Sequence, residues 1–233
     1  MKNSKILGFN ITFLEKGEDE DLLTEKNKGY YIFANSNTLV EGKYNALLNQ
    51  SLKNANLVLP DGFPLALIAR FKGVKRAKRL PGPDFTLKTI NYLRENRLSC
   101  CFYGGSKDES EIRKKILISK FPNLRFLSFS EIEEKEMIKA IKKYKVNYLF
   151  VSLGSPKQEI WAHNNKNINC KIFCVGIATP YILGERTRAP VSMRKYHLEW
   201  VYRLITEPKN CWRRYLINGP KFILLSLKEI IKK

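Results

Sequence analysis

The chain has 233 residues, of which 44% are hydrophobic and 12% aromatic, so a disordered polypeptide is excluded and a substantial core is possible. No run approaches the roughly 18 consecutive apolar residues of a membrane-spanning helix, and the N-terminus lacks the features of a secretory signal peptide. The formal net charge of +20 indicates an anionic partner, such as a phospholipid surface, a nucleic acid or a phosphorylated substrate.

The first part of the chain mixes strand and helix patterns. We expect strands over 5–15 and 29–35, and an amphipathic helix over 37–54. The apolar run 57–59 predicts a short buried strand that stops at Asp61. In open α/β sheets, ligands bind in the crevice outside the carboxyl ends of the strands. A carboxylate at this position is therefore either a helix cap or a functional group.

The rest of the α/β pattern is more regular. A helix is expected over 64–71, then a basic turn over 72–79, a Pro-Gly-Pro loop and a helix over 84–96. The strands and helices that follow alternate: strands at 99–104, 124–128, 147–153 and 171–177, with helices at 107–120, 131–144 and 157–166. Strands separated by helices of about 10–15 residues indicate a parallel sheet covered on both faces. We therefore predict a Rossmann-like α/β domain over residues 1–190.

The C-terminal segment has a different character. From about Val191 the pattern is helical, with breaks expected at Pro208 and at 219–220. Residues 186–233 contain twelve Lys and Arg against three Asp and Glu. The segment also holds several aromatic residues: Trp200, Tyr202, Trp212, Tyr215 and Phe222. We predict a basic helical appendage over residues 191–233.

The five cysteines are odd in number and lie mostly in apolar, strand-like runs, which indicates buried free thiols in a reducing cytoplasm. The neighbours Cys100 and Cys101 should point to opposite faces of a strand. Cys170 and Cys174 have no matching pair or nearby His, which argues against a zinc site.

Two strand-to-helix junctions carry glycines that allow a ligand to approach the backbone. The first contains Gly104 and Gly105; the second contains Gly154, followed by Lys157 and Gln158, which can face the crevice. Such glycines also occur for geometric reasons alone. Neither junction matches the Walker A or dinucleotide-binding spacing, which disfavours an NTPase or a dehydrogenase.

Metal-dependent and triad chemistry have weak candidates. Asp19 and Asp21 form a D-x-D pattern, but no apolar strand precedes it, so helix capping is favoured over metal binding. His163 lies in a polar helix and His197 in the basic tail, and no nucleophile elbow is present.

Six ordered blocks, spread over about residues 5–225, together resemble the WecG/TagA/CpsF family of bacterial glycosyltransferases. The blocks are Ala34-Asn35-Ser36-Asn37; Leu59-Pro60-Asp61-Gly62-Phe63-Pro64; Arg79-Leu80-Pro81-Gly82-Pro83-Asp84; Gly104-Gly105; Leu153-Gly154-Ser155-Pro156-Lys157-Gln158-Glu159; and Arg188-Ala189-Pro190 with Leu198-Glu199-Trp200, Arg203-Leu204, Glu207-Pro208 and Trp212-Arg213-Arg214-Tyr215.

The resemblance implies transfer of an N-acetylmannosamine-type sugar from UDP to a polyprenyl-diphosphate-linked acceptor, with inversion and without a metal or other cofactor. Asp61 matches the family's proposed base, and Asn35 a residue beside it that orients a sugar. Inversion needs one base to take the proton of the acceptor hydroxyl. The diphosphate needs cations and backbone donors. The candidate substrate-binding residues are Arg79, Gly104, Gly105, Gly154, Lys157, Gln158, Arg188 and Arg203. Of these, Arg79 could equally bind the diphosphate of the acceptor, and Arg203 could reach the active site from the tail.

The basic tail matches an enzyme that meets a lipid-linked acceptor at the inner face of the cytoplasmic membrane. Basic residues are attracted to anionic lipid, and Trp and Tyr are enriched at the interface. Our candidates for membrane contact are Trp212, Arg213, Arg214 and Lys221. The alternative is that Trp200 and Trp212 pack within a helical bundle. A homo-oligomer in which a neighbouring tail completes the crevice is also compatible with the sequence.

Other structural interpretations remain open at this stage. Asn35 could be a turn amide, Arg79 part of a solvated basic face, and Arg188 a partner in a structural ion pair. The chain also departs from the family at Phe33, where relatives often carry a small hydroxyl residue, and over 175–181. Both places could line the sugar pocket, so the transferred sugar stays open.

Two other functions compete with the enzyme. A nucleic-acid-binding protein would explain the charge and the interleaved aromatic residues, but a zinc-finger spacing, an RNP-like strand and a convincing helix-turn-helix are missing. An α/β scaffold that has lost catalysis is the third hypothesis. The presence of Asp61, Asn35 and Gln158 argues against it.

Overall fold

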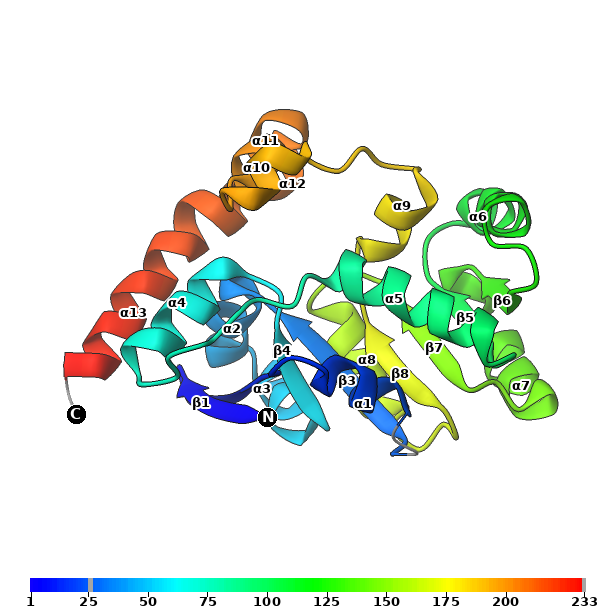
Figure 1. Ribbon diagram of the computed structural model, residues 1–233, viewed down its shortest axis with the longest axis horizontal. Coiled ribbons are helices and arrows are strands. Elements are labelled where there is room, and N and C mark those ends of the chain that lie inside the picture. The colour runs from blue at the N-terminus through cyan, green and yellow to red at the C-terminus, as the bar shows by residue number, and fades with distance from the viewer. Residues whose placement is uncertain (25–26, 232–233) are drawn as a thin grey trace.

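The computed structural model describes residues 1–24 and 27–231, and it confirms the predicted fold class. A six-stranded parallel sheet, with strand order β4-β3-β8-β7-β5-β6, is covered by helices on both faces (Figure 1). Its strands are β3 Gly29–Ala34, β4 Leu57–Pro60, β5 Ser99–Tyr103, β6 Arg125–Phe129, β7 Tyr148–Val151 and β8 Lys171–Cys174.

Side-chain alternation along the strands divides the core in two. In β3, Tyr30 and Ile32 belong to one apolar cluster, whereas Tyr31 and Phe33 belong to the other. The first cluster is covered by α2 Ser36–Tyr44, α3 Ala46–Asn54, α4 Phe63–Phe71, α7 Glu134–Tyr144 and α8 Lys157–Asn164. The second is covered by α1 Glu18–Thr24, α5 Gly82–Glu95, α6 Lys107–Lys120 and α9 Ala178–Leu183. A 3₁₀ turn, Glu131–Glu133, precedes α7.

Two predictions about the cysteines are confirmed, namely that they are buried free thiols and that Cys100 and Cys101 point to opposite faces. All five thiols are free and buried. Cys101 lies in the first cluster and Cys100 in the second, so the two neighbours do face opposite sides of β5.

The predicted strand over 5–15 is wrong. This region is an antiparallel hairpin of β1 Lys2–Ile6 and β2 Phe9–Phe13. Leu7 and Gly8 form its two-residue turn, with φ of 50° and 87°. Two-residue hairpin turns favour positive φ at both positions, which Asn-Gly usually supplies. Because the first turn position is a leucine, the sequence pattern does not indicate a turn here.

The predicted helix over 37–54 is also wrong as one element. It is interrupted at Asn45, whose φ of −108° and ψ of 112° are extended. The Asn45 side chain accepts a hydrogen bond of 3.0 Å from the Leu48 backbone N–H and so begins α3. An asparagine inside an apolar helical pattern can act as a helix start, because its side chain competes for backbone N–H groups.

The C-terminal segment forms α10 Val191–Lys195, α11 Glu199–Thr206, α12 Pro208–Trp212, a π-helical segment Arg213–Asn218 and α13 Gly219–Ile231. The predicted break at Pro208 is confirmed. The break predicted at 219–220 is wrong: Gly219 has helical φ and ψ of −60° and −61°. The wider π-helical turn before Pro220 accommodates a residue that lacks a backbone N–H.

Helix α13 packs on the α/β part of the molecule. Its Phe222 is fully buried and belongs to the same apolar cluster as β1, β2 and α2. The Glu229 carboxylate accepts hydrogen bonds of 2.7 Å from the Leu7 backbone N–H and from Lys72 Nζ. Within 1–24 and 27–231, no helix is both long and apolar enough to cross a membrane.

Candidate active site

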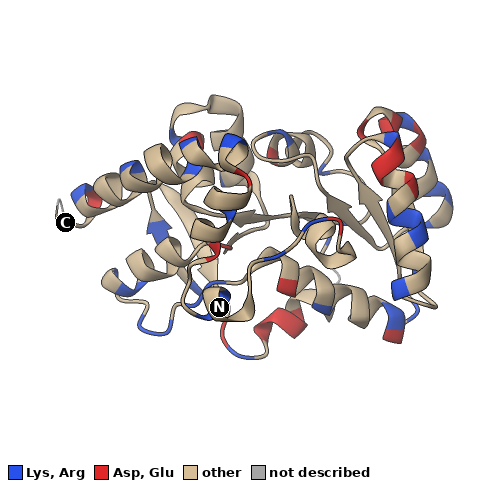
Figure 2. Ribbon diagram, turned by 90° about the horizontal axis from the view of Figure 1, so that it is seen from above, with Lys and Arg blue, Asp and Glu red and all other residues tan. Residues whose placement is uncertain are grey.

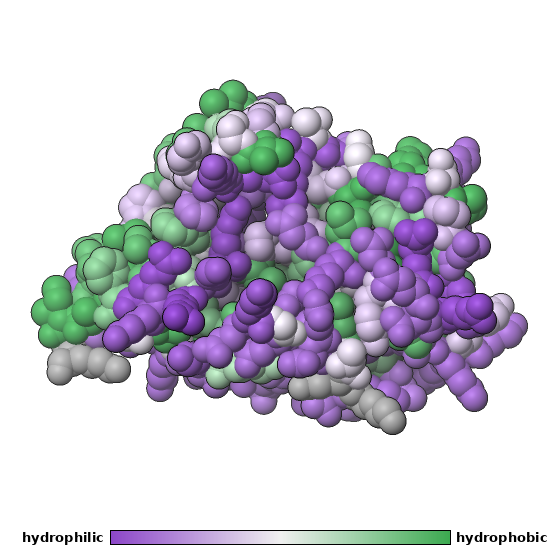
Figure 3. All heavy atoms as spheres, viewed as in Figure 1, coloured by the Kyte–Doolittle hydropathy of each residue, from purple (hydrophilic) through white to green (hydrophobic). Residues whose placement is uncertain are grey.

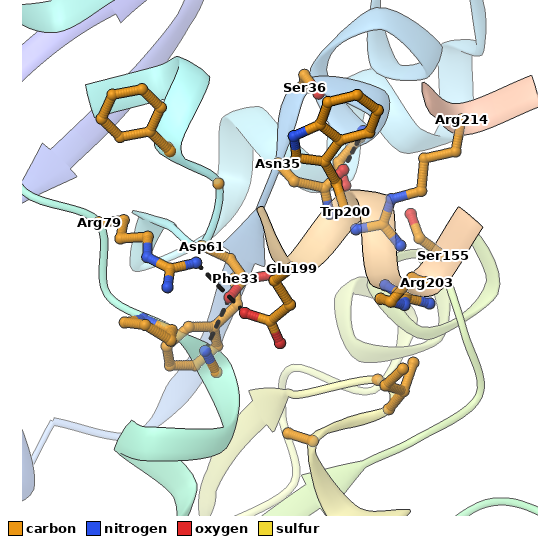
Figure 4. Close-up of a pocket in the computed structure, with 18 of the residues that line it drawn as sticks. Phe33, Asn35, Ser36, Asp61, Arg79, Ser155, Glu199, Trp200, Arg203 and Arg214 are labelled. Atoms are coloured by element: carbon orange, nitrogen blue, oxygen red, sulfur yellow. Dashed lines mark hydrogen bonds and ion pairs between the residues drawn. The ribbon is translucent and has the colours of Figure 1, made fainter. Parts of the chain in front are cut away.

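A cavity of about 340 Å³ lies at the carboxyl ends of β3, β4, β7 and β8 (Figure 4). Residues of α11 and of the π-helical segment close its other side. The cavity therefore lies at the edge of a parallel sheet where α/β proteins bind ligands. Of the predicted site residues, it brings together Asn35, Asp61, Arg79, Gly154, Gln158, Arg203 and Arg214.

Asn35 and Asp61 are neighbours because their strands are. Ala34 of β3 pairs with Pro60 of β4, and the Asp61 backbone N–H donates to the Ala34 carbonyl at 2.8 Å. Gly62 permits this approach, since a Cβ there would lie 3.3 Å from the Asn35 Cβ. Strand register thus places both side chains at the same point of the cavity wall.

The Asn35 side chain caps α2. Its Oδ1 accepts hydrogen bonds from the backbone N–H groups of Asn37 and Thr38, at 3.1 and 3.3 Å. The Nδ2 group has no hydrogen bond within the part of the chain that the structure describes. Asn35 can therefore cap the helix through its oxygen and donate to a ligand through its nitrogen.

Asp61 does not cap α4, because the N-cap residue of that helix is Gly62 and no side-chain hydrogen bond caps it. Its Oδ1 accepts a hydrogen bond of 2.8 Å from the Gly82 backbone N–H at the start of α5. The other oxygen, Oδ2, has no hydrogen-bond partner among residues 1–24 and 27–231. Burial raises the pKa of Asp61, and the charge of Glu199 raises it further, while the Gly82 hydrogen bond, Arg214 and Arg79 oppose the shift.

Four arginines lie at or near the cavity, and they differ in whether a carboxylate neutralises them. Arg79 and Arg188 are ion-paired with Glu199 at 3.5 and 3.4 Å. Arg188 also binds both oxygens of Asp84, so it forms the structural ion pairs foreseen as an alternative role. Arg188 does not line the cavity.

Arg203 and Arg214 have no carboxylate partner within 1–24 and 27–231. Arg203 Nη1 donates to the Tyr215 hydroxyl at 3.2 Å, and its Nε is buried without a hydrogen bond. The guanidinium of Arg214 lies 5.5 Å from the Tyr215 ring centroid. These two side chains present uncompensated positive charge to the cavity (Figure 4).

Gln158 is held rigidly at the cavity wall. Its Oε1 accepts a hydrogen bond of 3.0 Å from the Gly176 backbone N–H, and its Nε2 donates to Glu159 Oε1 at 2.9 Å. Glu159 is fully buried, and burial raises its pKa. Its Oε2 has no hydrogen-bond partner in the described residues.

The remaining predicted substrate-binding residues lie outside the cavity lining. Gly104 has a φ of 128°, and a Cβ there would lie 2.6 Å from the Ser152 carbonyl oxygen, so this glycine allows β5 and β7 to converge. The Gly105 carbonyl accepts a hydrogen bond from the Glu131 backbone N–H. Lys157 forms an ion pair with the Glu131 side chain.

The predicted membrane residues are divided. Arg214 lines the cavity, whereas Trp212 is 46% exposed on the outside, with Arg213 over its ring. Lys221 Nζ lies 3.8 Å from the centroid of the Tyr44 ring, in a shallow depression between α2 and α13.

Both departures from the family pattern are at the cavity. Phe33 lines it and packs against Phe85, with ring centroids 5.2 Å apart. Val175, Gly176, Ile177, Ala178 and Tyr181 line it as well.

Several lining residues carry chemistry that sequence reasoning assigned no role: Glu159, Tyr181, His197, Glu199, Trp200 and Tyr215. Glu199, Trp200 and Tyr215 come from helices far along the chain. His197 stacks on Phe63, with centroids 4.0 Å apart. The local signals are the family blocks that contain Glu159, Glu199, Trp200 and Tyr215 and the departure over 175–181 that contains Tyr181, and none of them gives a chemical role by itself.

Groups of three or more His, Cys, Asp or Glu that could hold a metal ion are not found within 1–24 and 27–231. The D-x-D segment lies in α1. There Asp19 and Glu20 bind Lys88 Nζ at 2.5 and 2.9 Å.

The fold and the cavity define an α/β protein that places a carboxylate and free arginines at the carboxyl edge of a parallel sheet. By its sequence, the chain belongs to the glycosyl transferase WecG/TagA/CpsF family, whose model matches residues 5–233.

The chain is also similar to curated proteins that share one name. The chain is 27% identical, over 90% of its length and 83% of the other, to an N-acetylglucosaminyldiphosphoundecaprenol N-acetyl-beta-D-mannosaminyltransferase of Bacillus spizizenii. It is 28% identical to a Bacillus subtilis protein of that name, over 76% and 71% of the two chains. For a Staphylococcus aureus protein of that name the identity is 27%, over 82% and 75%.

Proposed function

We propose that this protein transfers an N-acetylmannosamine-type or related sugar from a UDP-sugar to a sugar linked to a polyprenyl diphosphate. The transfer inverts the anomeric centre in a single displacement and needs no metal. The names of the relatives support the acceptor class. The product serves the synthesis of a cell-surface polysaccharide.

The observation that carries this proposal is the pairing of one open carboxylate oxygen with uncompensated arginines in one cavity. Asp61 Oδ2 takes the proton of the acceptor hydroxyl as the hydroxyl oxygen attacks the anomeric carbon. Burial raises the pKa of this carboxyl, and a catalytic base is most effective with a pKa near the working pH. Asn35 Nδ2 is placed beside Asp61 to orient a sugar hydroxyl.

Departure of UDP leaves negative charge on a diphosphate oxygen as the anomeric C–O bond breaks. Arg203 and Arg214 form no ion pair with a carboxylate of the described residues, so they can neutralise that charge without first losing such a pair. Arg79 is held by Glu199, and we assign it to the acceptor diphosphate. Gln158, fixed on both sides, serves as a rigid polar contact for the donor.

The enzyme works in the cytoplasm, at the inner face of the cytoplasmic membrane, because a lipid-linked acceptor stays in the bilayer. The basic tail, with Trp212, Arg213 and Lys221 on its outside, supports attachment to anionic lipid. A homo-oligomer is compatible with this arrangement.

The test is UDP release from a panel of UDP-sugars with a short-chain polyprenyl-diphosphate acceptor, in EDTA. We expect acceptor-dependent release that falls by a factor of about 10² to 10⁴ in Asp61→Asn, the range for loss of a general base. Asp84→Asn is the matched control, because Asp84 binds Arg188 outside the cavity. If calorimetry finds no UDP binding to the folded wild type, the proposal fails.

A further inference from the structure

The segment 71–79, which joins α4 to α5, exposes an unusual combination of side chains. It contains five Lys and Arg and no Asp or Glu (Figure 2). Lys75, Arg76 and Lys78 are exposed, and their side chains have no hydrogen bond or ion pair to any residue of 1–24 and 27–231. Phe71, the last residue of α4, is 68% exposed. Phe71 therefore places an exposed aromatic side chain close in sequence to cations that have no partner in the described residues.

The segment is ordered in spite of its exposure. Arg70 Nε donates to the Ala77 carbonyl at 2.9 Å, and Ala77 is fully buried. Within the turn, the Val74 backbone N–H donates to Ala69 and the Ala77 N–H to Val74, at 2.9 and 3.0 Å. These contacts fix the backbone, so binding through the exposed side chains costs little additional backbone entropy.

The same end of the molecule carries a second exposed apolar group. Leu224, Leu227 and Ile231 of α13 are 55%, 45% and 81% exposed, and their spacing places them on one face of the helix. The ion pair of Lys72 with Glu229, at 2.7 Å, ties this end of α13 to the start of the segment. Figure 3 shows hydrophobic surface at the α13 end of the molecule, with hydrophilic side chains beside it.

Exposed apolar side chains next to unpaired Lys and Arg are typical of surfaces that bind anionic membranes. The apolar groups enter the headgroup region, and the cations meet anionic lipid. A nucleic acid would use the cations but would leave the aliphatic residues of α13 unpartnered.

We propose that segment 71–79 is a membrane-contact element that binds anionic phospholipid, with Phe71 inserted between headgroups and Lys75, Arg76 and Lys78 at the surface. The outer face of α13 lies on the membrane beside it. The segment ends at Arg79 in the cavity wall, eight residues from Phe71, a span of about 29 Å at most. Membrane contact through this segment would hold the cavity within reach of a diphosphate at the bilayer surface. This last role rests on the proposed function.

Vesicle co-sedimentation of the full chain tests this element. The probes are vesicles of phosphatidylcholine alone or with phosphatidylglycerol. The triple variant Lys75→Gln, Arg76→Gln, Lys78→Gln is compared with Lys139→Gln, Lys142→Gln, Lys143→Gln on α7, at the far end of the sheet (Figure 1). Both remove three charges, so overall charge cannot distinguish them. We expect the partition coefficient on anionic vesicles to fall about a hundredfold in the first and little in the second.

Insertion of Phe71 has a separate readout. Since all five native thiols are buried, Phe71→Cys can be labelled selectively with an environment-sensitive fluorophore. Emission should rise on anionic vesicles, while the same label on Ile132→Cys, 76% exposed near α7, should not respond.

Three results would overturn the inference. The first is equal vesicle binding by the two triple variants, and the second is no vesicle binding by the wild type. The third is a 75/76/78 variant that loses binding to a DNA oligonucleotide but keeps its binding to anionic vesicles. Calorimetry with UDP reports on the proposed function separately. A wild type without UDP affinity would refute that function, while the vesicle comparison would still decide this inference.

Discussion

The two carboxyl oxygens of Asp61, which lines the cavity, have different surroundings. One oxygen accepts the Gly82 N–H, and the other accepts no hydrogen bond from the part of the chain that the structure describes. Because burial raises its pKa above the ordinary 3.8, the folded state holds this proton more tightly than the unfolded state. The stability that the group contributes is therefore present below pH 3.8 and is lost as the pH rises through the folded pKa.

The first prediction is that Asp61→Asn, which mimics the neutral form, is more stable than the wild type at pH 7. The gain in unfolding free energy should be about 0.5–2 kcal/mol, as for other substitutions that relieve a destabilised site. Urea unfolding from pH 7 downward measures it, and the gain should vanish near pH 3.8. A variant less stable than the wild type at pH 7 would contradict this account. Asp84→Asn, which loses an ion pair with Arg188, should show no gain.

Glu199 links two arginines to the base. It pairs with Arg79 and Arg188. Burial is the main cause of the raised pKa of Asp61, and the negative charge of Glu199 raises it further. We predict that Glu199→Gln lowers the pKa of Asp61, so the acid limb of kcat/KM against pH moves to lower pH. Glu207→Gln is the control, since Glu207 pairs with Arg186 instead. A limb that stays in place, or moves to higher pH, would refute this coupling.

The placement of Asn35 and Asp61 could be predicted because both follow directly from local patterns. An apolar run that stops at a polar residue marks a strand end, and parallel strand ends meet at one edge of a sheet. Glu199 and Arg214 could not be placed in this way, since their positions depend on how helices over 100 residues further along fold back. Arg214 was assigned to the membrane for that reason, although the structure places it at the cavity.

At the level of elements, α2 and α3 both begin with an asparagine as the N-cap residue. Asn35 and Asn45 each accept backbone N–H groups of the following helix, but only Asn35 lines the cavity. Loss of an asparagine cap costs about 1 kcal/mol. We expect Asn35→Ala and Asn45→Ala to lose similar stability in thermal unfolding.

Activity should separate the two positions. Asn35→Ser keeps an oxygen that can cap α2 and loses the Nδ2 donor without adding a charge beside Asp61. It should therefore remain stable but transfer sugar about tenfold more slowly, as for one lost hydrogen bond. Asn45→Ala should keep its rate. If Asn35→Ser is as active as the wild type, Asn35 acts only as a helix cap.

The elements that sequence patterns missed have identifiable physical causes. The hairpin turn at Leu7 uses a residue that rarely adopts positive φ, and the supposed break at 219–220 is avoided by a π-helical turn. Both depend on contacts with distant parts of the chain. The periodicity of apolar residues indicates only which face of an element is buried, so it does not predict these distant contacts.

At the scale of the whole molecule, the C-terminal helix and the α/β sheet share a core. Phe222 is fully buried in the cluster that contains the N-terminal hairpin. Phe222→Ala should cost about 3–5 kcal/mol, which lowers the melting temperature by roughly 6–20 °C for a protein of this size. Calorimetry should show one transition.

The control is Leu224→Ala on the outer face of the same helix, which should change stability by less than about 0.5 kcal/mol. If Phe222→Ala instead gives a separate low-temperature transition with an unchanged main one, α13 unfolds by itself. That result would favour two independently folding parts, divided near the boundary predicted between the α/β domain over 1–190 and the appendage over 191–233.

The bond between the Leu7 N–H and Glu229 joins residues 222 positions apart. At about 5–20 residues per second, the ribosome needs roughly 10–45 s to make the chain between them. Throughout that interval the hairpin turn lacks its partner, and the apolar surface that later receives Phe222 is open to solvent. The nascent protein therefore cannot complete its core during synthesis of the sheet, and chaperones that shield apolar surface have a defined period in which to act.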